Sequence, residues 1–217
     1  MKRLLKFIKK YEFPVHLLII NTVFLKYISS KFYTLTSKFK LKILNCKIGS
    51  NFSSDGKLWI WLQKKNSINI GDNVRINSRL GSNLVGLTNP TIFQCFKDGN
   101  IKIGNGCGLS SVVISSRAGI SIGSNTVIGG NTRIFDHDFH SLDYIKRSDI
   151  KMDQMNIKSK PISIGDNVFI GTNVLILKGV KIGDRSIIGA GSVVTKDIDS
   201  DQIWAGNPAV KISINKI

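Results

Sequence analysis

With 217 residues, 42% of them hydrophobic, the chain is long enough for one sizeable core, and its 31 lysines and arginines against 14 aspartates and glutamates give a net charge of +17. A basic surface attracts nucleic acid, anionic lipid or anionic small molecules, but no nucleic-acid-binding motif accompanies the charge, so we expect no nucleic-acid partner. The three cysteines, Cys46, Cys95 and Cys107, match no disulfide or metal-site spacing, which excludes a disulfide scaffold and favours a reducing, cytoplasmic compartment.

Basic residues gather at the amino terminus, where residues 1–44 hold ten lysines or arginines and one acidic residue, Glu12. Residues 13–28 are the most apolar run of the chain, but polar residues interrupt it and a transmembrane helix needs about 20 apolar residues. No cleavage site of a signal peptide follows the run. We expect residues 1–45 to form a basic amphipathic helical segment packed on the body of the protein. The alternative is a peripheral anchor on anionic lipid at the inner face of a membrane.

An internal repeat begins near residue 46 and is irregular at first. Residues 59–62 indicate a strand with an aromatic face, and residues 82–100 lose the period, which predicts a loop or an irregular coil. Units in which glycine follows an aliphatic residue open at Ile48, Ile70, Ile103 and Ile122. Because 19 residues separate the last two openers, we expect one coil to carry a single inserted residue.

The repeat becomes regular over residues 164–198, where an aliphatic residue returns every six positions. A period of six fits neither an amphipathic helix nor an alternating strand, but it is typical of a chain that turns a corner every six residues. Three sides make a coil of about 18 residues, and stacked coils form parallel strands about 4.8 Å apart. The spacing places Ile164 beneath Ile182, Ile170 beneath Ile188, and Ile176 beneath Val194. We therefore predict a parallel β-helix.

A polar loop at residues 136–160 interrupts the repeat. It holds two of the chain's three histidines and three aspartates within eight residues, namely Asp136, His137, Asp138, His140 and Asp143. Functional residues concentrate on loops that a rigid scaffold holds in place, so the loop is the candidate site. Aspartate and histidine at this spacing can also bind zinc. The third histidine, His16, is far away in the sequence, and we expect no metal site.

Three stretches carry a family resemblance: residues 161–171, residues 188–198 and the Ala-Gly-Asn-Pro-Ala of residues 205–209. They are similar to the hexapeptide-repeat acyltransferases, and most to the maltose, galactoside and capsule or exopolysaccharide O-acetyltransferases. The resemblance covers roughly residues 46–212 and implies an all-β, left-handed parallel β-helix, a homotrimer with active sites between subunits, and acetyl-CoA as the donor. Residues 213–217 are then a tail.

His140 opens a His-Ser-Leu-Asp stretch that is similar to the family's His-x-Leu-Asp motif, whose first residue is the catalytic histidine. A hydroxyl is a poor nucleophile until a base takes its proton, and histidine suits this role because its unperturbed pKa is about 6.5. We interpret His140 as the general base. A carboxylate on the other ring nitrogen would fix the tautomer. Asp138 is the preferred candidate to orient His140 or to bind a sugar hydroxyl, with Asp136 and Asp143 as alternatives. The candidate acceptor contacts are His137, Asp136, Ser110 and Arg147.

In relatives, the pantetheine arm of the donor lies along the groove between neighbouring prisms, against small side chains of late coils. Transferred by motif, these positions are Thr172, Ala190 and Thr195, which we expect on one ladder. Lys196 and Lys211 are candidates for the phosphates. The sequence departs from the family at Phe169, where relatives usually carry tryptophan, and at Lys211, where lysine lacks the bidentate fork of the arginine in many relatives.

The resemblance thus implies an acetyl-CoA-dependent O-acetyltransferase that modifies a sugar hydroxyl of a bacterial-type surface polysaccharide (capsule, O-antigen or exopolysaccharide) or its precursor. The loop contains no cysteine, so we expect direct transfer without an acetyl-enzyme intermediate. Two alternatives are an N-acetyltransferase of a nucleotide-linked amino sugar and, less favoured because the His-Ser-Leu-Asp stretch is intact, a non-catalytic β-helical scaffold.

Overall fold

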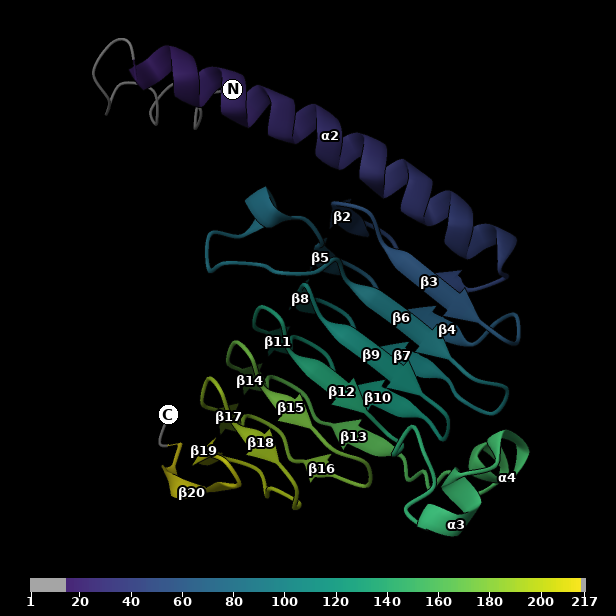
Figure 1. Cartoon of the computed structure of the whole chain (residues 1–217). Coiled ribbons are helices and arrows are strands. Elements are labelled where there is room, and N and C mark those ends of the chain that lie inside the picture. Colours follow the sequence, from purple (N-terminus) through teal and green to yellow (C-terminus); the bar gives the residue numbers. More distant parts are fainter. Residues whose placement is uncertain (1–14, 216–217) are drawn as a thin grey trace.

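The computed structural model describes the backbone of residues 15–215 and the side chains of residues 23–215. In this part of the chain, three parallel sheets form a three-sided prism, a long helix crosses one end of it, and a helical loop projects from one corner (Figure 1). The helices are α2 (Val15–Ile43), η1 (Leu80–Ser82), α3 (Tyr144–Arg147) and α4 (Ile150–Met155). The predicted parallel β-helix is confirmed.

Each coil contributes one short strand to each sheet. Sheet A contains β1 (Lys47–Ile48), β4 (Ile68–Ile70), β7 (Ile101–Ile103), β10 (Ile120–Ile122), β13 (Ile162–Ile164) and β16 (Lys181–Ile182). Sheet B contains β2 (Ser53–Asp55), β5 (Arg75–Asn77), β8 (Gly108–Ser110), β11 (Val127–Ile128), β14 (Phe169–Ile170), β17 (Ile187–Ile188), β19 (Gln202–Gly206) and β20 (Ala209–Ile214). Sheet C contains β3 (Trp59–Leu62), β6 (Ile92–Cys95), β9 (Val113–Ser116), β12 (Arg133–Phe135), β15 (Leu175–Ile176) and β18 (Val193–Val194).

The register confirms the predicted stacking of aliphatic residues. The aligned pairs are Ile164 with Ile182, Ile170 with Ile188, and Ile176 with Val194. Ile103 aligns with Ile122, so the single inserted residue is absorbed between two coils. Inward side chains of all three sheets form one buried cluster, because each strand turns an aliphatic residue toward the axis and the next coil places another above it.

Two segments differ from the sequence-based expectation. The irregular region expected at residues 82–100 is shorter, because β6 already rejoins sheet C at Ile92 in register with β3 and β9. At the carboxyl end, β20 continues to Ile214, past the expected start of the tail at residue 213, because it pairs antiparallel with β19. Cys46, Cys95 and Cys107 are free thiols buried in the core.

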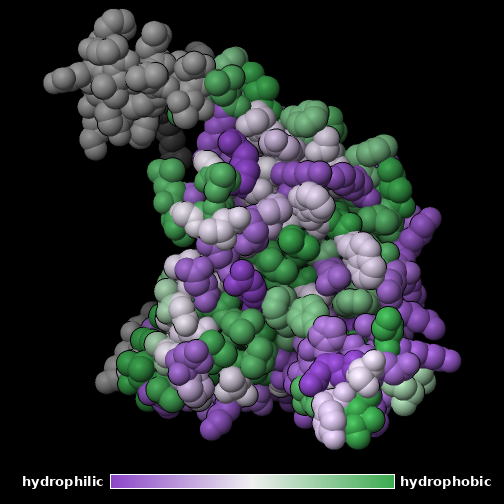
Figure 2. All heavy atoms as spheres, viewed as in Figure 1, coloured by the Kyte–Doolittle hydropathy of each residue, from purple (hydrophilic) through white to green (hydrophobic). Residues whose placement is uncertain are grey.

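A single helix, α2, covers the first coil. Leu41 is fully buried in the prism core, and Thr34 exchanges two hydrogen bonds with the backbone of Ser54 on β2, at 2.9 and 3.2 Å. The opposite margin of the helix is rich in apolar side chains (Figure 2). Residues 1–14, part of the segment predicted to be helical, lie outside the described residues. No helix in the described part of the chain is both long enough and apolar enough to cross a membrane.

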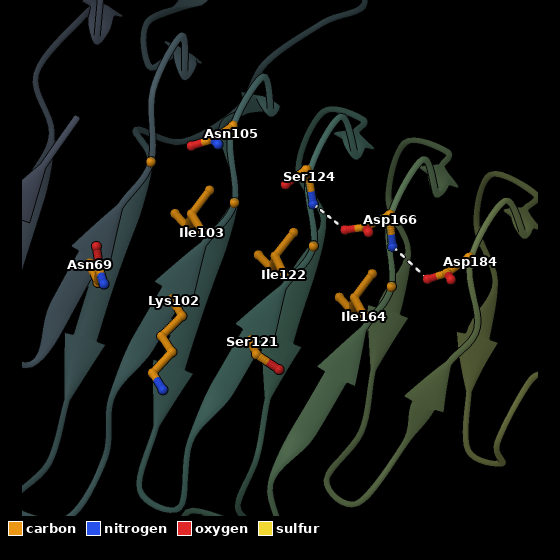
Figure 3. Close-up of a pocket in the computed structure, with 14 residues that line it drawn as sticks. Asn69, Lys102, Ile103, Asn105, Ser121, Ile122, Ser124, Ile164, Asp166 and Asp184 are labelled. Atoms are coloured by element: carbon orange, nitrogen blue, oxygen red, sulfur yellow. Dashed lines mark hydrogen bonds between the residues drawn. The ribbon is translucent and has the colours of Figure 1, made fainter. Parts of the chain in front are cut away.

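The corners between sheets A and B are held by side-chain caps that run from coil to coil. Asp166 accepts a hydrogen bond from the backbone N–H of Ser124 at 2.6 Å, and Asp184 accepts one from the N–H of Asp166 at 2.8 Å (Figure 3). Gly165 is required here because a Cβ at this position would lie 2.2 Å from the Asp184 carboxylate. A hollow runs along this corner, and the capping residues Ser124, Asp166 and Asp184, which hold one coil to the next, form part of its lining.

The central ladder predicts a large, local cost of truncation. Ile170 is fully buried between Ile128 and Ile188, so Ile170→Ala should lower the free energy of unfolding by about 2–5 kcal/mol. Lys181→Ala, at an exposed position of the neighbouring sheet, should change it by less than about 0.5 kcal/mol. Urea unfolding followed by circular dichroism would measure both. Equal effects would contradict the aliphatic ladder as the source of stability.

Candidate active site

The projecting loop is anchored by a buried carboxylate where the chain leaves sheet C. Asp136 follows β12 and accepts hydrogen bonds at 2.7–2.9 Å from the Ser116 hydroxyl and from three successive backbone N–H groups, those of Arg117, Ala118 and Gly119. His137 adds a fifth partner at 3.0 Å through Nδ1. Burial alone would raise the pKa of Asp136, but the hydrogen bonds from His137 and the backbone outweigh it and hold the pKa below its ordinary value. The loop therefore leaves the prism from a rigid base.

The centre of the loop is a histidine–carboxylate pair. His140 lies in the exposed part of the loop, with 65% of its side chain accessible, and its Nδ1 is 2.7 Å from Oδ2 of Asp153 on α4. The other oxygen of Asp153 accepts the backbone N–H of Ser141 at 2.6 Å. Those two contacts lower the pKa of Asp153, the Ser141 N–H having the larger effect. A carboxylate on Nδ1 selects the neutral tautomer that carries its proton on Nδ1, which leaves Nε2 free to accept a proton.

Two short helices bring Asp153 back to His140. Asp143 caps α3 by accepting the N–H groups of Ile145 and Lys146, and Asp149 caps α4 by accepting that of Met152 at 2.8 Å. Arg147 on α3 donates to the carbonyl oxygen of Ser141 at 2.7 Å. Asp143 and Arg147, predicted as catalytic and acceptor-binding residues, thus make contacts that shape the loop around His140.

The structure corrects the expected partner of His140. Asp138, the preferred candidate, instead forms an ion pair with Lys178 at the start of the loop. Asp153 takes the orienting position instead. The sequence pattern does not single out Asp153, because this residue lies 13 positions after His140 on a helix of only six residues that no periodicity reveals. Asp149, a typical helix N-cap residue four positions before Asp153, was the one available signal.

The structure also corrects the expected acceptor contacts of Asp136 and His137. Both side chains are fully buried, which leaves them no surface for an acceptor. The ring of His137 packs edge-on against Phe96, with ring centroids 5.2 Å apart, and lies 4.3 Å from the ring of Phe139. The pair is therefore part of the loop's base, and the exposed candidate is His140.

A groove of about 450 Å³ lies on the outer face of sheet B. Small residues of successive coils form its floor, among them Gly108, Gly130 and Thr172, and Phe169 contributes an aromatic wall. Ser110 also lines it and accepts hydrogen bonds at 3.1 Å from the side chains of Asn77 and Asn83. The segment after η1 overhangs this groove, because Val85 and Leu87 approach Gly130. A narrow channel with a backbone floor fits a long, thin ligand such as a pantetheine arm.

The residues predicted to bind the donor lie at two corners rather than on one ladder. Thr172 and Ala190 occupy equivalent positions one coil apart at the corner between sheets B and C. Thr195 follows β18 at the next corner, between sheets C and A, which is also where the loop projects. The reason is the spacing, since Thr195 lies five residues after Ala190 and only positions 18 apart stack. Lys196 and Lys211 are exposed.

Comparison with known proteins shows the family. A model described as the hexapeptide repeat of succinyl-transferase matches residues 161–196. WbbJ of Escherichia coli K12, a putative lipopolysaccharide biosynthesis O-acetyl transferase, is 32% identical over 152 residues, which cover 69% of this chain and 72% of WbbJ. The chain therefore belongs to the hexapeptide-repeat acetyltransferases, whose fold is a left-handed parallel β-helix.

Two further relatives agree with this placement. Galactoside O-acetyltransferase of Escherichia coli K12 is 43% identical over 89 residues, or 41% of each chain. The hexapeptide-repeat acetyltransferase VCA0836 of Vibrio cholerae, solved with acetyl coenzyme A, is 28% identical with a TM-score of 0.50 and covers 77% of this chain and 73% of its own. Apart from WbbJ, the chain spans about half the length, or less, of the curated relatives that it matches.

Within residues 23–215 no cluster of three potential metal ligands is present.

The buried anchor predicts a pH-dependent stability. Asp136→Asn places amide hydrogens against N–H donors, so it should lower the free energy of unfolding at pH 7 by about 1–3 kcal/mol. Because the folded pKa of Asp136 lies below its unfolded value of about 3.9, the carboxylate stabilises the fold above that pH and its contribution is lost as the pH falls through the folded pKa. The difference between the variant and the wild type should therefore shrink under acid. Urea unfolding across this range would test it, with exposed Asp98→Asn as the matched control; a difference that grows toward acid would contradict it.

Proposed function

We propose that the chain is an acetyl-CoA-dependent O-acetyltransferase that modifies a sugar hydroxyl of a bacterial-type surface polysaccharide or its precursor. The observation that carries the proposal is the pair of His140 and Asp153, an exposed imidazole fixed by a buried carboxylate on a loop with a rigid base. The lipopolysaccharide assignment of WbbJ and the galactoside assignment of a second relative support a carbohydrate acceptor.

Direct transfer follows from the groups present. Nε2 of His140 takes the proton of the acceptor hydroxyl as its oxygen attacks the thioester carbonyl carbon of the donor. The C–O bond forms, the C–S bond breaks, and the proton passes from the imidazolium to the departing sulfur. Asp153 remains a carboxylate throughout and stabilises the imidazolium that forms between the two proton transfers. All three cysteines are buried, and burial raises the pKa of Cys95 to about 12, so none is placed to form an acetyl-enzyme.

The position of the loop supports a site shared between subunits of a homotrimer. His140 projects from the corner between sheets C and A, whereas the groove with Gly108 and Thr172 opens on sheet B. In Figure 1 the loop with α3 and α4 and the segment that overhangs the groove lie at opposite edges of the prism. Within one prism the loop and the groove therefore lie on different sides. In a cyclic trimer, the loop of one prism would face the groove of the next.

The first test is acceptor-dependent release of CoA from acetyl-CoA, measured with free sugars, nucleotide sugars and glycan extracts. His140→Ala should lower kcat about 10²- to 10⁴-fold, the usual contribution of a general base. Asp153→Asn should lower it about 10- to 100-fold, because a hydrogen bond to a charged group contributes about 1.5–3 kcal/mol. Asp98→Asn, at an exposed position of the turn between β6 and β7, is the matched control. Full activity of His140→Ala would remove His140 as the base, and no release with any acceptor would count against the transferase.

The second test is complementation between two inactive variants. His140→Ala removes the base, and Gly108→Phe fills the groove at a position where an added Cβ meets no atom within 4 Å, so the fold should tolerate it. Each variant alone should be inactive. Co-expressed in equal amounts, they should form mixed trimers with about one quarter of the wild-type activity, because one site in four combines an intact loop with an intact groove.

The control for complementation is a chain that carries both substitutions, co-expressed with either single variant; such mixtures contain no intact site. Two different affinity tags would verify that mixed oligomers form, and light scattering would give their mass. Mixed trimers without recovered activity would show that the groove and His140 do not meet across the subunit boundary.

A further inference from the structure

Helix α2 presents two opposite faces. One packs on the first coil through Leu41, which is fully buried, and Ser37, which is 1% exposed. The other is a stripe of six apolar side chains, each 50–69% exposed, that follow one another every three or four residues along the helix. The outer stripe consists of Phe24, Ile28, Phe32, Leu35, Phe39 and Ile43. Exposed apolar residues scattered singly are ordinary, but an aligned, aromatic-rich stripe on a helix marks an interaction surface.

Lysines flank the outer stripe. At 100° per residue, Lys31, Lys38 and Lys42 fall along one side of it and Lys40 along the other, and all four are exposed. The helix contains no aspartate or glutamate between Val15 and Ile43. An apolar stripe between rows of lysines, with no acidic residue, matches an anionic lipid surface, where the apolar side chains enter the boundary of the acyl chains and the ammonium groups meet phosphates.

An apolar groove continues the outer stripe toward the prism. It holds about 690 Å³ between α2 and the turn at η1, and Leu25, Ile28 and Phe32 line one side of it. Arg79 lies in the same groove and is tied to Asp55 at 2.7 Å, with Lys26 also 3.8 Å from Asp55. The groove therefore adds apolar surface beside the outer stripe, while its two cations are engaged with Asp55.

We propose that the outer stripe of α2 docks the protein on an anionic lipid bilayer, with the helix parallel to the membrane plane. A second copy of the helix is a poorer occupant, because two such stripes would bring rows of lysines together with no acidic side chain to pair with them. Because α2 lies across the end of the prism (Figure 1), docking would direct the axis of the prism away from the membrane plane. The inference rests on α2 alone and is independent of the reaction at His140.

The test uses the full-length protein and sedimentation with vesicles of equimolar phosphatidylglycerol and phosphatidylcholine, or of phosphatidylcholine alone. Wild type should bind the anionic vesicles and bind the neutral ones far more weakly. The combined variant Phe32→Ser, Leu35→Ser, Phe39→Ser should lower the partition coefficient about 100-fold. The combined variant Lys31→Gln, Lys38→Gln, Lys42→Gln should lower it by a similar factor on anionic vesicles at low salt and should not change binding to neutral ones.

A matched control removes three equally exposed apolar side chains at the other end of the prism, Val210→Ser, Ile212→Ser and Ile214→Ser, and should bind like the wild type. Circular dichroism and light scattering would verify the fold and the mass of every variant. If the wild type does not sediment with anionic vesicles, the proposal is overturned. It is also overturned if the serine substitutions on α2 leave the partition coefficient unchanged. A fall in oligomer mass with those substitutions would instead assign the outer stripe to contacts between copies.

Discussion

The alignment of each coil with the next is the constraint on which the rest of the structure depends. A strand of two or three residues turns only one or two side chains inward, so stability comes from stacking, as where Ile170 lies between Ile128 and Ile188. Because each coil is paired with its neighbours rather than with the residues next to it in sequence, a long insertion at a corner leaves the alignment intact. Ser121 and Ser163 are aligned across 42 residues of chain that include the whole projecting loop. The scaffold can therefore carry a chemically active loop without loss of register.

The side chains of the loop change from buried to exposed over a few residues. Asp136 accepts hydrogen bonds from Ser116, from the turn at Arg117–Gly119 and from His137, and the ring of His137 packs between those of Phe96 and Phe139. Four residues after Asp136, His140 reaches solvent with only Asp153 and its own backbone to hold it. A general base needs both properties, since its orientation must be fixed while its free nitrogen stays accessible. Asp136 and Asp153, two carboxylates of the same loop, thus have different roles because their surroundings differ.

Much of the fold followed from the sequence because the period of six is local and each unit repeats the same requirement. The exposed histidine also followed, through the His-Ser-Leu-Asp motif. What the sequence could not supply was the return of the chain through two helices, on which the contact between His140 and Asp153 depends. Proximity in sequence favours Asp138 as the partner of His140, yet Asp138 forms an ion pair with Lys178, forty residues away. Similarly, the family motif groups Thr195 with Thr172 and Ala190, whereas the three-sided geometry places Thr195 at a different corner.

The two ends of the prism differ from its middle in a way that fixes its length. A stack of parallel strands has an unpaired edge at each end, and such an edge can recruit another chain and grow into a fibre. At the first coil, α2 lies over the edge and sends Leu41 into the core. At the last coil, β20 reverses direction and pairs antiparallel with β19, so sheet B ends in a strand that runs against the stack. The helix and the reversed strand therefore disfavour end-to-end pairing of prisms, so that a repetitive chain does not polymerise.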